Sequence, residues 1–300
     1  MNTGSILKKF RKNRHLSQQS LCEGIITRQT YSKIENNQLE PNYEILLHLL
    51  DRLGYEVSDF AREVNRNSNS SKFYKLFLKG IGNDLTITEA TALFEYVQSK
   101  RYISSRDFHL YGVTKGHLHK KFPTIIPAYT EEDKEYFRNF IKSSFAFYGL
   151  YDLKIIGDFL PHLLTYKEIK TLYKNLPDFP PLDYVEDSEI YRTQIHKIYN
   201  NICEIAIFSG DPLLAKEVLE KHKSFSKVHP ELRYLIYIQI NEISIDYLLT
   251  NNKLVLDKLL DISKAMQLIG ENVLSEAIVN QHKTLLKEKE YNSIDTITYD

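Results

Sequence analysis

The sequence has few cysteines, no long apolar run and no net charge, and each of these absences removes a class of protein. Its two cysteines, Cys22 and Cys203, lie far apart in the 300 residues, so we expect two buried thiols rather than a disulfide framework. No stretch is apolar enough to span a bilayer, and the basic, polar N-terminus has no apolar signal core behind it. These absences predict a cytoplasmic protein with no membrane partner.

Patterns that carry enzyme chemistry are also scarce. The sequence has no glycine-rich loop of the kind that holds phosphate. His117 and His119 could belong to a metal site, but no further ligand stands at supporting spacing, so we expect a solvated loop there. Cys203 and His196 are two helical turns apart, too far for a nucleophile and its base. The sequence therefore predicts no enzyme activity, no metal and no cofactor.

The residues that are present describe a globular chain with a basic head. Hydrophobic residues make up 42% and charged residues 26%, a balance that buries a real core, and the length suggests about two domains. The zero net charge hides an uneven distribution, because residues 1–35 hold seven basic side chains against two acidic ones. Such a head can approach phosphate while the mildly acidic body stays away from nucleic acid.

Short helices account for residues 1–65, where apolar residues recur at helical spacing. The expected boundaries are Ser17 and Thr27 as N-caps, Gly24 as a left-handed helix end, Asn36-Asn37 as a turn and Pro41 as the residue that opens a fourth helix. A fifth helix is expected over residues 58–64. The second and third helices have the spacing of a helix-turn-helix.

The rest of the chain is predicted to form helical hairpins after a polar linker. The segment NRNSNSS lacks apolar residues, so we place a linker at 66–71, between a DNA-binding domain at 1–65 and a helical domain at 72–290, with a tail at 291–300. The expected helix starts are the capping boxes Thr86/Glu89 and Thr165/Glu168, Thr130 before a helix to about Tyr148, and Asp211-Pro212.

Two segments of the helical domain repeat the same pattern. Residues 188–225 and 229–266 each predict a long helix, a short polar break and a second helix, offset by about forty residues. Tetratricopeptide-like (TPR-like) repeats have an offset of this order, and they stack because one repeat cannot bury its apolar face alone. The sequence therefore predicts an all-α protein, with an N-terminal five-helix repressor-type helix-turn-helix domain followed by a right-handed TPR-like solenoid. The exact type of repeat does not follow from the sequence.

The head resembles the helix-turn-helix family of phage repressors and xenobiotic-response-element regulators. The residues that carry the resemblance are Ile6, Arg11, Ser17-Gln18, Leu21, residues 27–36 (TRQTYSKIEN), Pro41 and Leu46. We expect Arg11 and Glu35 to form an internal ion pair, as in the family, and Tyr31 and Ile34 to face the core. Asn37 stands where the family usually has glycine, and asparagine tolerates the left-handed backbone of that turn.

The third helix is expected to enter the major groove of operator DNA by its N-terminal part. The side chains expected to contact DNA are Gln18, Thr27, Arg28, Gln29, Ser32, Lys33 and Asn36. Arginine can bind guanine and glutamine can bind adenine through two hydrogen bonds, each worth ~1–3 kcal/mol of discrimination. Gln18, at the start of the second helix, is expected to bind a phosphate and so to position the domain without reading sequence.

A repressor-type head before a large helical-repeat body resembles the Rgg/GadR/MutR regulators of Gram-positive bacteria, relatives of the pheromone-sensing PlcR and PrgX proteins. This resemblance rests on domain order, length and hairpin pattern. It implies a homodimer, a short intracellular peptide pheromone bound on the concave face of the repeats, and control of transcription.

Candidate peptide-binding residues lie on polar stripes of the predicted repeats, because an extended peptide needs partners for its backbone amides and asparagine both donates and accepts. These candidates are Arg138, Asn139, Asn201, Arg233, Tyr237 and Asn241. Each could equally be a solvent-facing residue. The body could also be only a dimerisation or protein-interaction scaffold. A third alternative, the peptide-regulated phosphatases and response-regulator antagonists, carries a helical bundle in place of a DNA-reading head.

Overall fold

The computed structural model describes residues 2–65, 75–79, 85–143, 149–175 and 189–294, which form helices and no strand. The chain divides into two compact units, Met1–Tyr96 and Val97–Asp300. The linker predicted at 66–71 lies outside the described residues. Of the tail predicted at 291–300, residues 291–294 belong to the last helix, and the others lie outside the described part.

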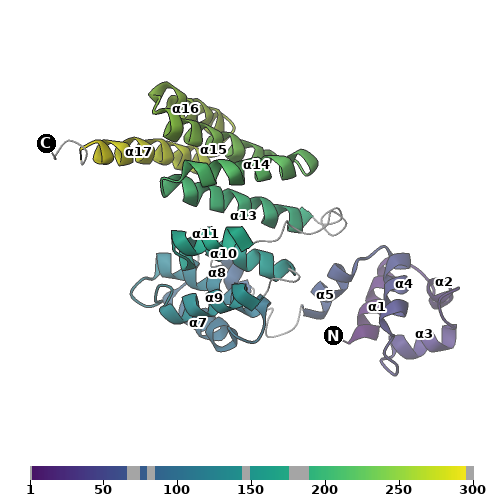
Figure 1. Cartoon of the computed structure of the whole chain (residues 1–300). Coiled ribbons are helices and arrows are strands. Elements are labelled where there is room, and N and C mark those ends of the chain that lie inside the picture. The colour runs from purple at the N-terminus through teal and green to yellow at the C-terminus, as the bar shows by residue number, and fades with distance from the viewer. Residues whose placement is uncertain (1, 66–74, 80–84, 144–148, 176–188, 295–300) are drawn as a thin grey trace. The chain divides into compact units, whose positions relative to one another are not determined.

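The first unit begins with the five expected helices (Figure 1). They are α1 (Thr3–Asn13), α2 (Gln18–Cys22), α3 (Arg28–Glu35), α4 (Tyr43–Leu53) and α5 (Val57–Asn65). The Ser17 and Thr27 hydroxyls accept hydrogen bonds from the N–H groups of Ser20 and Thr30, so both predicted N-caps are confirmed. The prediction that Pro41 opens the fourth helix is wrong by two positions, because Asn42 caps α4 and the helix begins at Tyr43.

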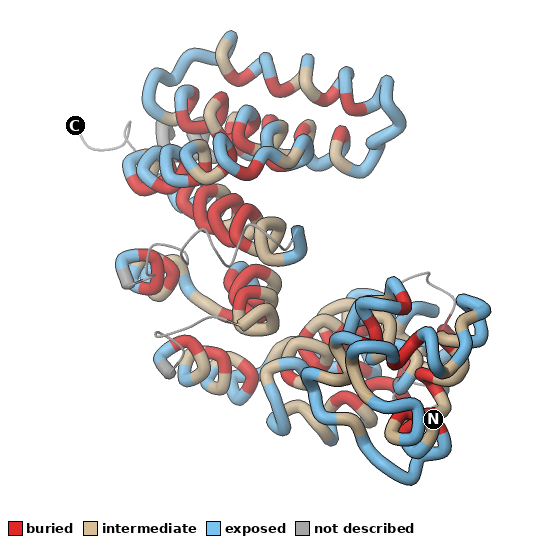
Figure 2. Tube along the Cα trace, turned by 90° about the vertical axis from the view of Figure 1, so that its right-hand side faces the viewer, coloured by how far each residue is buried: buried red, intermediate tan, exposed pale blue. Residues whose placement is uncertain are grey.

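One small core holds these helices together. Its buried residues are Ile6, Leu7, Phe10, Leu21, Cys22, Tyr31, Ile34, Leu49, Leu50 and Leu53. Tyr31 and Ile34 face this core, as expected, and Cys22 is a buried free thiol. Gly24 and Asn37 adopt the left-handed backbone at φ 72° and 56°, as the two turns require. In Figure 2 the buried stretches alternate with exposed ones along each helix.

The second unit is a succession of longer helices, and α7 (Ile87–Lys100) crosses the boundary between the units. The others are α8 (Ser105–Lys121), α9 (Glu131–Ser143), α10 (Leu150–Leu163), α11 (Tyr166–Asn175), α13 (Glu189–Phe208), α14 (Pro212–Val228), α15 (Leu232–Thr250), α16 (Lys253–Leu268) and α17 (Asn272–Ile294). Both predicted capping boxes and the Asp211 N-cap are confirmed. The helix after Thr130 is described to Ser143, and its expected end at Tyr148 lies outside the described residues.

The two predicted repeats are the hairpins α13–α14 and α15–α16. Each helix packs on the next one along the chain, and α13 also packs on α10 and on α15. The apolar faces of α13 and α15 are buried along most of their length, including Cys203. Figure 1 shows these helices stacked, and α17 packs on α16. The all-α prediction of a repressor-type head followed by stacked helical repeats is confirmed.

No helix in the described residues is both long and apolar enough to cross a bilayer.

Candidate DNA-reading and ligand-binding sites

Helix α3 presents a polar face at its N-terminal end. Thr27 is the N-cap, and Arg28 and Gln29 follow it with exposed side chains. Lys33 is exposed one turn further on, and Ser32 is half-buried. Asn36, the C-cap at the other end of the helix, is exposed as well.

A buried carboxylate ties α3 to α1 and α2. Glu35, 3% exposed, accepts hydrogen bonds from Arg11 Nε (2.6 Å), Arg11 Nη2 (3.1 Å), Tyr31 Oη (2.9 Å) and Gln18 Nε2 (2.7 Å). Burial alone would raise the pKa of Glu35, but the hydrogen bonds from Arg11, Gln18 and Tyr31 outweigh it and lower that pKa. The internal ion pair expected between Arg11 and Glu35 is confirmed.

This network gives Gln18 a second task. Its side-chain amide is bound to Glu35, so it fixes the distance between the start of α2 and the end of α3. The sequence analysis placed Gln18 at a phosphate and did not connect it with Glu35. This contact could have been suspected from the sequence, because a buried carboxylate such as Glu35 can accept more hydrogen bonds than the Arg11 guanidinium donates.

Asn37 closes α1 against the end of α3, a contact that the sequence analysis missed. Its Oδ1 accepts from the Gly4 N–H (3.0 Å), and its Nδ2 donates to Ser5 Oγ (3.1 Å). A Cβ on Gly4 would lie 1.8 Å from the Ile34 carbonyl oxygen, so only glycine fits there. The asparagine that replaces the family's usual glycine therefore contributes hydrogen bonds as well as a tolerated φ angle.

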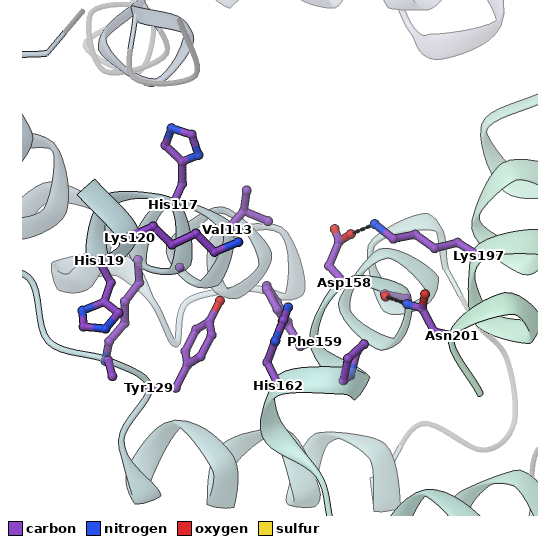
Figure 3. Close-up of a pocket in the computed structure, with 15 residues that line it drawn as sticks. Val113, His117, His119, Lys120, Tyr129, Asp158, Phe159, His162, Lys197 and Asn201 are labelled. Atoms are coloured by element: carbon purple, nitrogen blue, oxygen red, sulfur yellow. Dashed lines mark hydrogen bonds and ion pairs between the residues drawn. The ribbon is translucent and has the colours of Figure 1, made fainter. Parts of the chain in front are cut away.

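The second unit contains an open cleft of about 480 Å³ between α8, α10 and α13 (Figure 3). Its lining residues are Val113, Lys115, Gly116, His117, His119, Lys120, Ala128, Tyr129, Gly157, Asp158, Phe159, Pro161, His162, Lys197 and Asn201. Asn201 is the one predicted peptide-binding residue among them. Lys120, Asp158, His162 and Lys197 were missed, although the i,i+3 spacing from His117 to Lys120 and the i,i+4 spacing from Lys197 to Asn201 each put two polar side chains on one helix face.

The expected solvated loop at His117 and His119 is wrong. Both residues lie in the last turns of α8, half-buried, and His119 Nδ1 donates a hydrogen bond to the Ile126 carbonyl (2.8 Å). Gly116 lies inside this helix, at a close contact with Tyr129. A Cβ there would lie 2.4 Å from the Tyr129 hydroxyl, which donates to the Gly112 carbonyl (2.9 Å).

Asp158 joins the three helices at the edge of the cleft. Its carboxylate accepts from His109 Nε2 on α8 (2.6 Å) and pairs with Lys197 Nζ on α13. Burial opposes the charge on Asp158, but the His109 hydrogen bond and the nearby Lys197 ammonium lower its pKa. The carboxylate is therefore ionised and already shared between two partners.

Asn201 completes the hydrogen bonding of α10. Pro161 lies inside that helix and has no N–H, so the carbonyl of Gly157 loses its helical partner. Asn201 Nδ2 donates to this carbonyl at 2.7 Å. The side chain thus holds α13 against α10 at the point where the proline interrupts the helix.

The other predicted peptide-binding residues do not share one surface. On α9, Asn139 is exposed, and Arg138 Nε donates to Glu168 at 2.7 Å. On α15, Arg233 is exposed and Tyr237 is half-buried. Asn241 on the same helix is fully buried and donates to Asn200 Oδ1 (3.0 Å), a contact that joins α15 to α13. The Asn241 Oδ1 atom has no hydrogen-bond partner in the described part of the chain.

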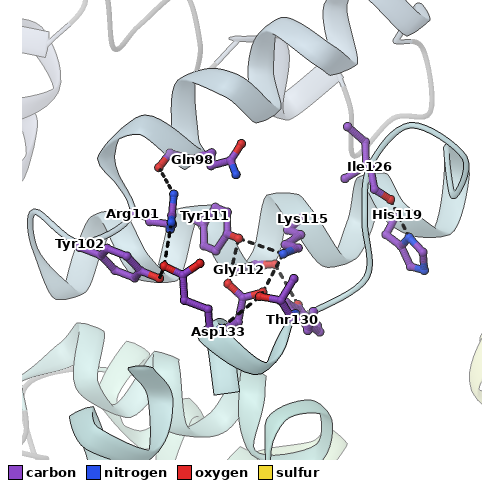
Figure 4. Close-up of polar contacts among 12 residues, drawn as sticks. Gln98, Arg101, Tyr102, Tyr111, Gly112, Lys115, His119, Ile126, Thr130 and Asp133 are labelled. Carbon is purple, nitrogen blue, oxygen red and sulfur yellow. Dashed lines mark hydrogen bonds and ion pairs between the residues drawn. The ribbon is translucent and has the colours of Figure 1, made fainter. Parts of the chain in front are cut away.

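A buried ion pair fixes the start of α9 against α8 (Figure 4). Lys115 Nζ donates to Asp133 Oδ2 (2.6 Å) and to the Tyr111 hydroxyl (3.0 Å), which in turn donates to Asp133 Oδ1 (2.9 Å). The Thr130 N–H donates to the same carboxylate at 2.7 Å. The side chains of Lys115, Tyr111 and Asp133 are thus all hydrogen-bonded, and Lys115 is one of the residues that line the cleft. Among the described residues, no three His, Cys, Asp or Glu side chains gather as metal ligands.

Comparison with known proteins agrees with this architecture. Residues 7–60 match the helix-turn-helix family, so the chain carries a helix-turn-helix domain. No curated protein matches the chain significantly.

Several solved structures share the fold of the whole chain. The PrgX/cCF10 complex is 18% identical and has a TM-score of 0.71, with 95% of this chain and 99% of that chain covered. A bacterial peptide pheromone/receptor complex is 18% identical, covers 94% and 98%, and has a TM-score of 0.68. The Streptococcus dysgalactiae SHP pheromone receptor Rgg2 is 16% identical, covers 94% and 99%, and has a TM-score of 0.72. At these identities the likeness establishes the fold.

Proposed function

We propose that this protein is a cytoplasmic, sequence-specific transcriptional regulator that binds operator DNA as a homodimer and is controlled by a short peptide. One observation carries the proposal: the chain combines a helix-turn-helix head with a repeat unit that contains a ligand-sized cleft. In the head, the N-terminal end of the recognition helix α3 is polar. A cleft of about 480 Å³ falls within the ~300–1,000 Å³ of ordinary ligand sites.

The head supports DNA reading by the chemistry of α3. Arg28 and Gln29 are exposed at the first two helical positions, the part of a recognition helix that reaches base edges. Gln18 and Arg11 hold α3 through Glu35, so the reading face is presented by a fixed scaffold. A fixed scaffold lowers the entropy lost when side chains order on DNA.

Peptide control is supported by the repeat unit. Solved structures of this fold include a bacterial peptide pheromone/receptor complex and the SHP pheromone receptor Rgg2, each with 94% of this chain covered. In the chain itself, Asn201, one of the residues predicted to bind the peptide, is among those that line the cleft. A homodimer follows from the small number of base contacts that one head offers.

The proposal is tested by selection of DNA from a random pool with the full-length protein. An inverted repeat should be enriched, with half-sites centred about 34–36 Å apart or at a multiple of that spacing. Arg28→Ala should enrich a sequence that is relaxed at particular base pairs, whereas Lys12→Ala, an exposed lysine on α1, should leave the selected sequence unchanged. Failure of the wild-type protein to enrich any sequence would contradict the DNA-reading function.

A further inference from the structure

The cleft between α8, α10 and α13 combines two kinds of wall. Val113 and Phe159 give it an apolar side, and Pro161 extends this side along α10. Beside them lie the basic side chains of Lys120, His162 and Lys197, which come from three different helices, as Figure 3 shows. A ligand that fits both walls carries apolar groups next to a negative charge.

The charges in the cleft do not cancel. Asp158 is the one carboxylate in its lining, and His109 and Lys197 already share that carboxylate. Lys115 already forms the buried ion pair with Asp133. Lys120 is exposed, and no ion pair within the described residues joins it to a carboxylate.

His162 lies near Lys120 in the cleft lining. Burial lowers its pKa, and the nearby Lys120 ammonium lowers it further. Its ring stacks on Tyr129 with centroids 6.1 Å apart, so its position at the cleft wall is fixed. An anion bound beside Lys120 would offset the effect of that ammonium on the pKa of His162.

We propose that this cleft binds a carboxylate of the short peptide, with Lys120 as the principal cation and His162 beside it. This inference rests on the proposed peptide control. The carboxylate belongs either to the C-terminus of the peptide or to an acidic side chain, and the apolar wall packs against the neighbouring aliphatic or aromatic residues. The cleft volume suits a few residues at one end of the ligand.

The test uses the full-length protein and two synthetic heptapeptide pools with randomised apolar positions and occasional Asp or Glu. One pool has a free C-terminal carboxylate and the other is amidated. Peptides retained by wild type, Lys120→Gln and Lys121→Gln are quantified by mass spectrometry after gel filtration. Lys121 is the matched control, since it neighbours Lys120 but lies over the Phe122 ring and does not line the cleft.

The wild type should retain carboxylate-bearing peptides about tenfold or more over neutral ones, the size expected for a charge-assisted hydrogen bond. Lys120→Gln should lose most of that preference, and Lys121→Gln should keep it. Loss of retention on amidation assigns the terminal carboxylate, whereas retention of only Asp- or Glu-containing peptides assigns a side chain. Equal retention of neutral and acidic peptides would overturn the carboxylate site and leave peptide control intact. Retention of no peptide from either pool would overturn peptide control itself.

Discussion

At the scale of single residues, an asparagine side chain in the second unit replaces a hydrogen bond that a proline removes from its helix. The Gly157 carbonyl, orphaned by Pro161, has a partner only because Asn201 reaches it from the neighbouring helix. A buried carbonyl left without a partner costs about 1–3 kcal/mol. The same residue was singled out from the sequence for peptide binding, so its structural task must be separated from any contact with a ligand.

A double-mutant cycle makes that separation. Asn201→Ala should lower the free energy of unfolding by about 1–3 kcal/mol, measured by urea denaturation. In the Pro161→Ala background the helix regains an N–H for the Gly157 carbonyl, so the same change should cost less. Asn139→Ala, on an exposed position of α9, should have little effect. Equal losses in both backgrounds would show that Asn201 does not substitute for the missing N–H.

The head offers a second residue-scale prediction. Gln18→Ala removes one hydrogen bond from the buried Glu35 carboxylate and loosens α2 against α3. We expect DNA binding to weaken evenly across sequences, because positioning is lost while base contacts remain. Arg28→Ala should instead change the preference at particular base pairs. Affinities measured for a panel of single-base operator variants distinguish the two patterns, and a base-specific effect of Gln18→Ala would contradict its positioning role.

At the scale of elements, two neutral histidines, His196 and His222, join α13 to α14 within the first hairpin. His196 Nε2 donates to the His229 carbonyl (2.7 Å), and His222 Nε2 donates to His196 Nδ1 (3.0 Å). The His196 ring also stacks on Tyr234 at 4.7 Å between centroids. Burial, with a smaller contribution from His196, lowers the pKa of His222 to about 3, and burial also lowers that of His196.

The repeat unit should therefore be sensitive to acid. Because the folded pKa of His222 lies below the unfolded value of about 6.5, the unfolded chain binds the proton more tightly. Stability is complete above about pH 6.5 and falls as the pH drops from there towards 3, by up to ~1.4 kcal/mol per pH unit for one histidine. His222→Gln should flatten this dependence in urea titrations at several pH values. An unchanged slope in that variant would assign the acid sensitivity to other groups.

The elements themselves could largely be predicted from the sequence, because helix caps are local. Ser17, Thr27 and Asp211 begin helices as expected, since a side-chain oxygen three residues before an open N–H is enough to fix a helix start. The cleft could not be predicted, because it depends on which helices become neighbours. His117 and His119 were expected in a loop, yet they lie in α8, where Gly116 leaves room for the Tyr129 hydroxyl, a tertiary contact.

At the scale of the whole molecule, the proposed homodimer makes a prediction of its own. Light scattering of the full-length protein at micromolar concentration should give twice the mass of the 35.2 kDa chain, on operator DNA and without it. The reason is that one head makes too few base contacts for specific binding at physiological salt. A monomer under both conditions would contradict the proposed mode of DNA reading.

We propose that peptide binding and DNA binding are coupled through the dimer. A peptide shifts the protein only if it binds two arrangements of the dimer unequally, and such coupling is typically ~1–3 kcal/mol. The most direct measurement is the fluorescence anisotropy of a labelled operator duplex titrated with the full-length protein, with and without saturating peptide from the retained pool. We predict a change in operator affinity of roughly 5- to 150-fold in one direction, reduced when Lys120→Gln replaces the wild type. Identical operator affinity with and without a peptide that demonstrably binds would contradict it.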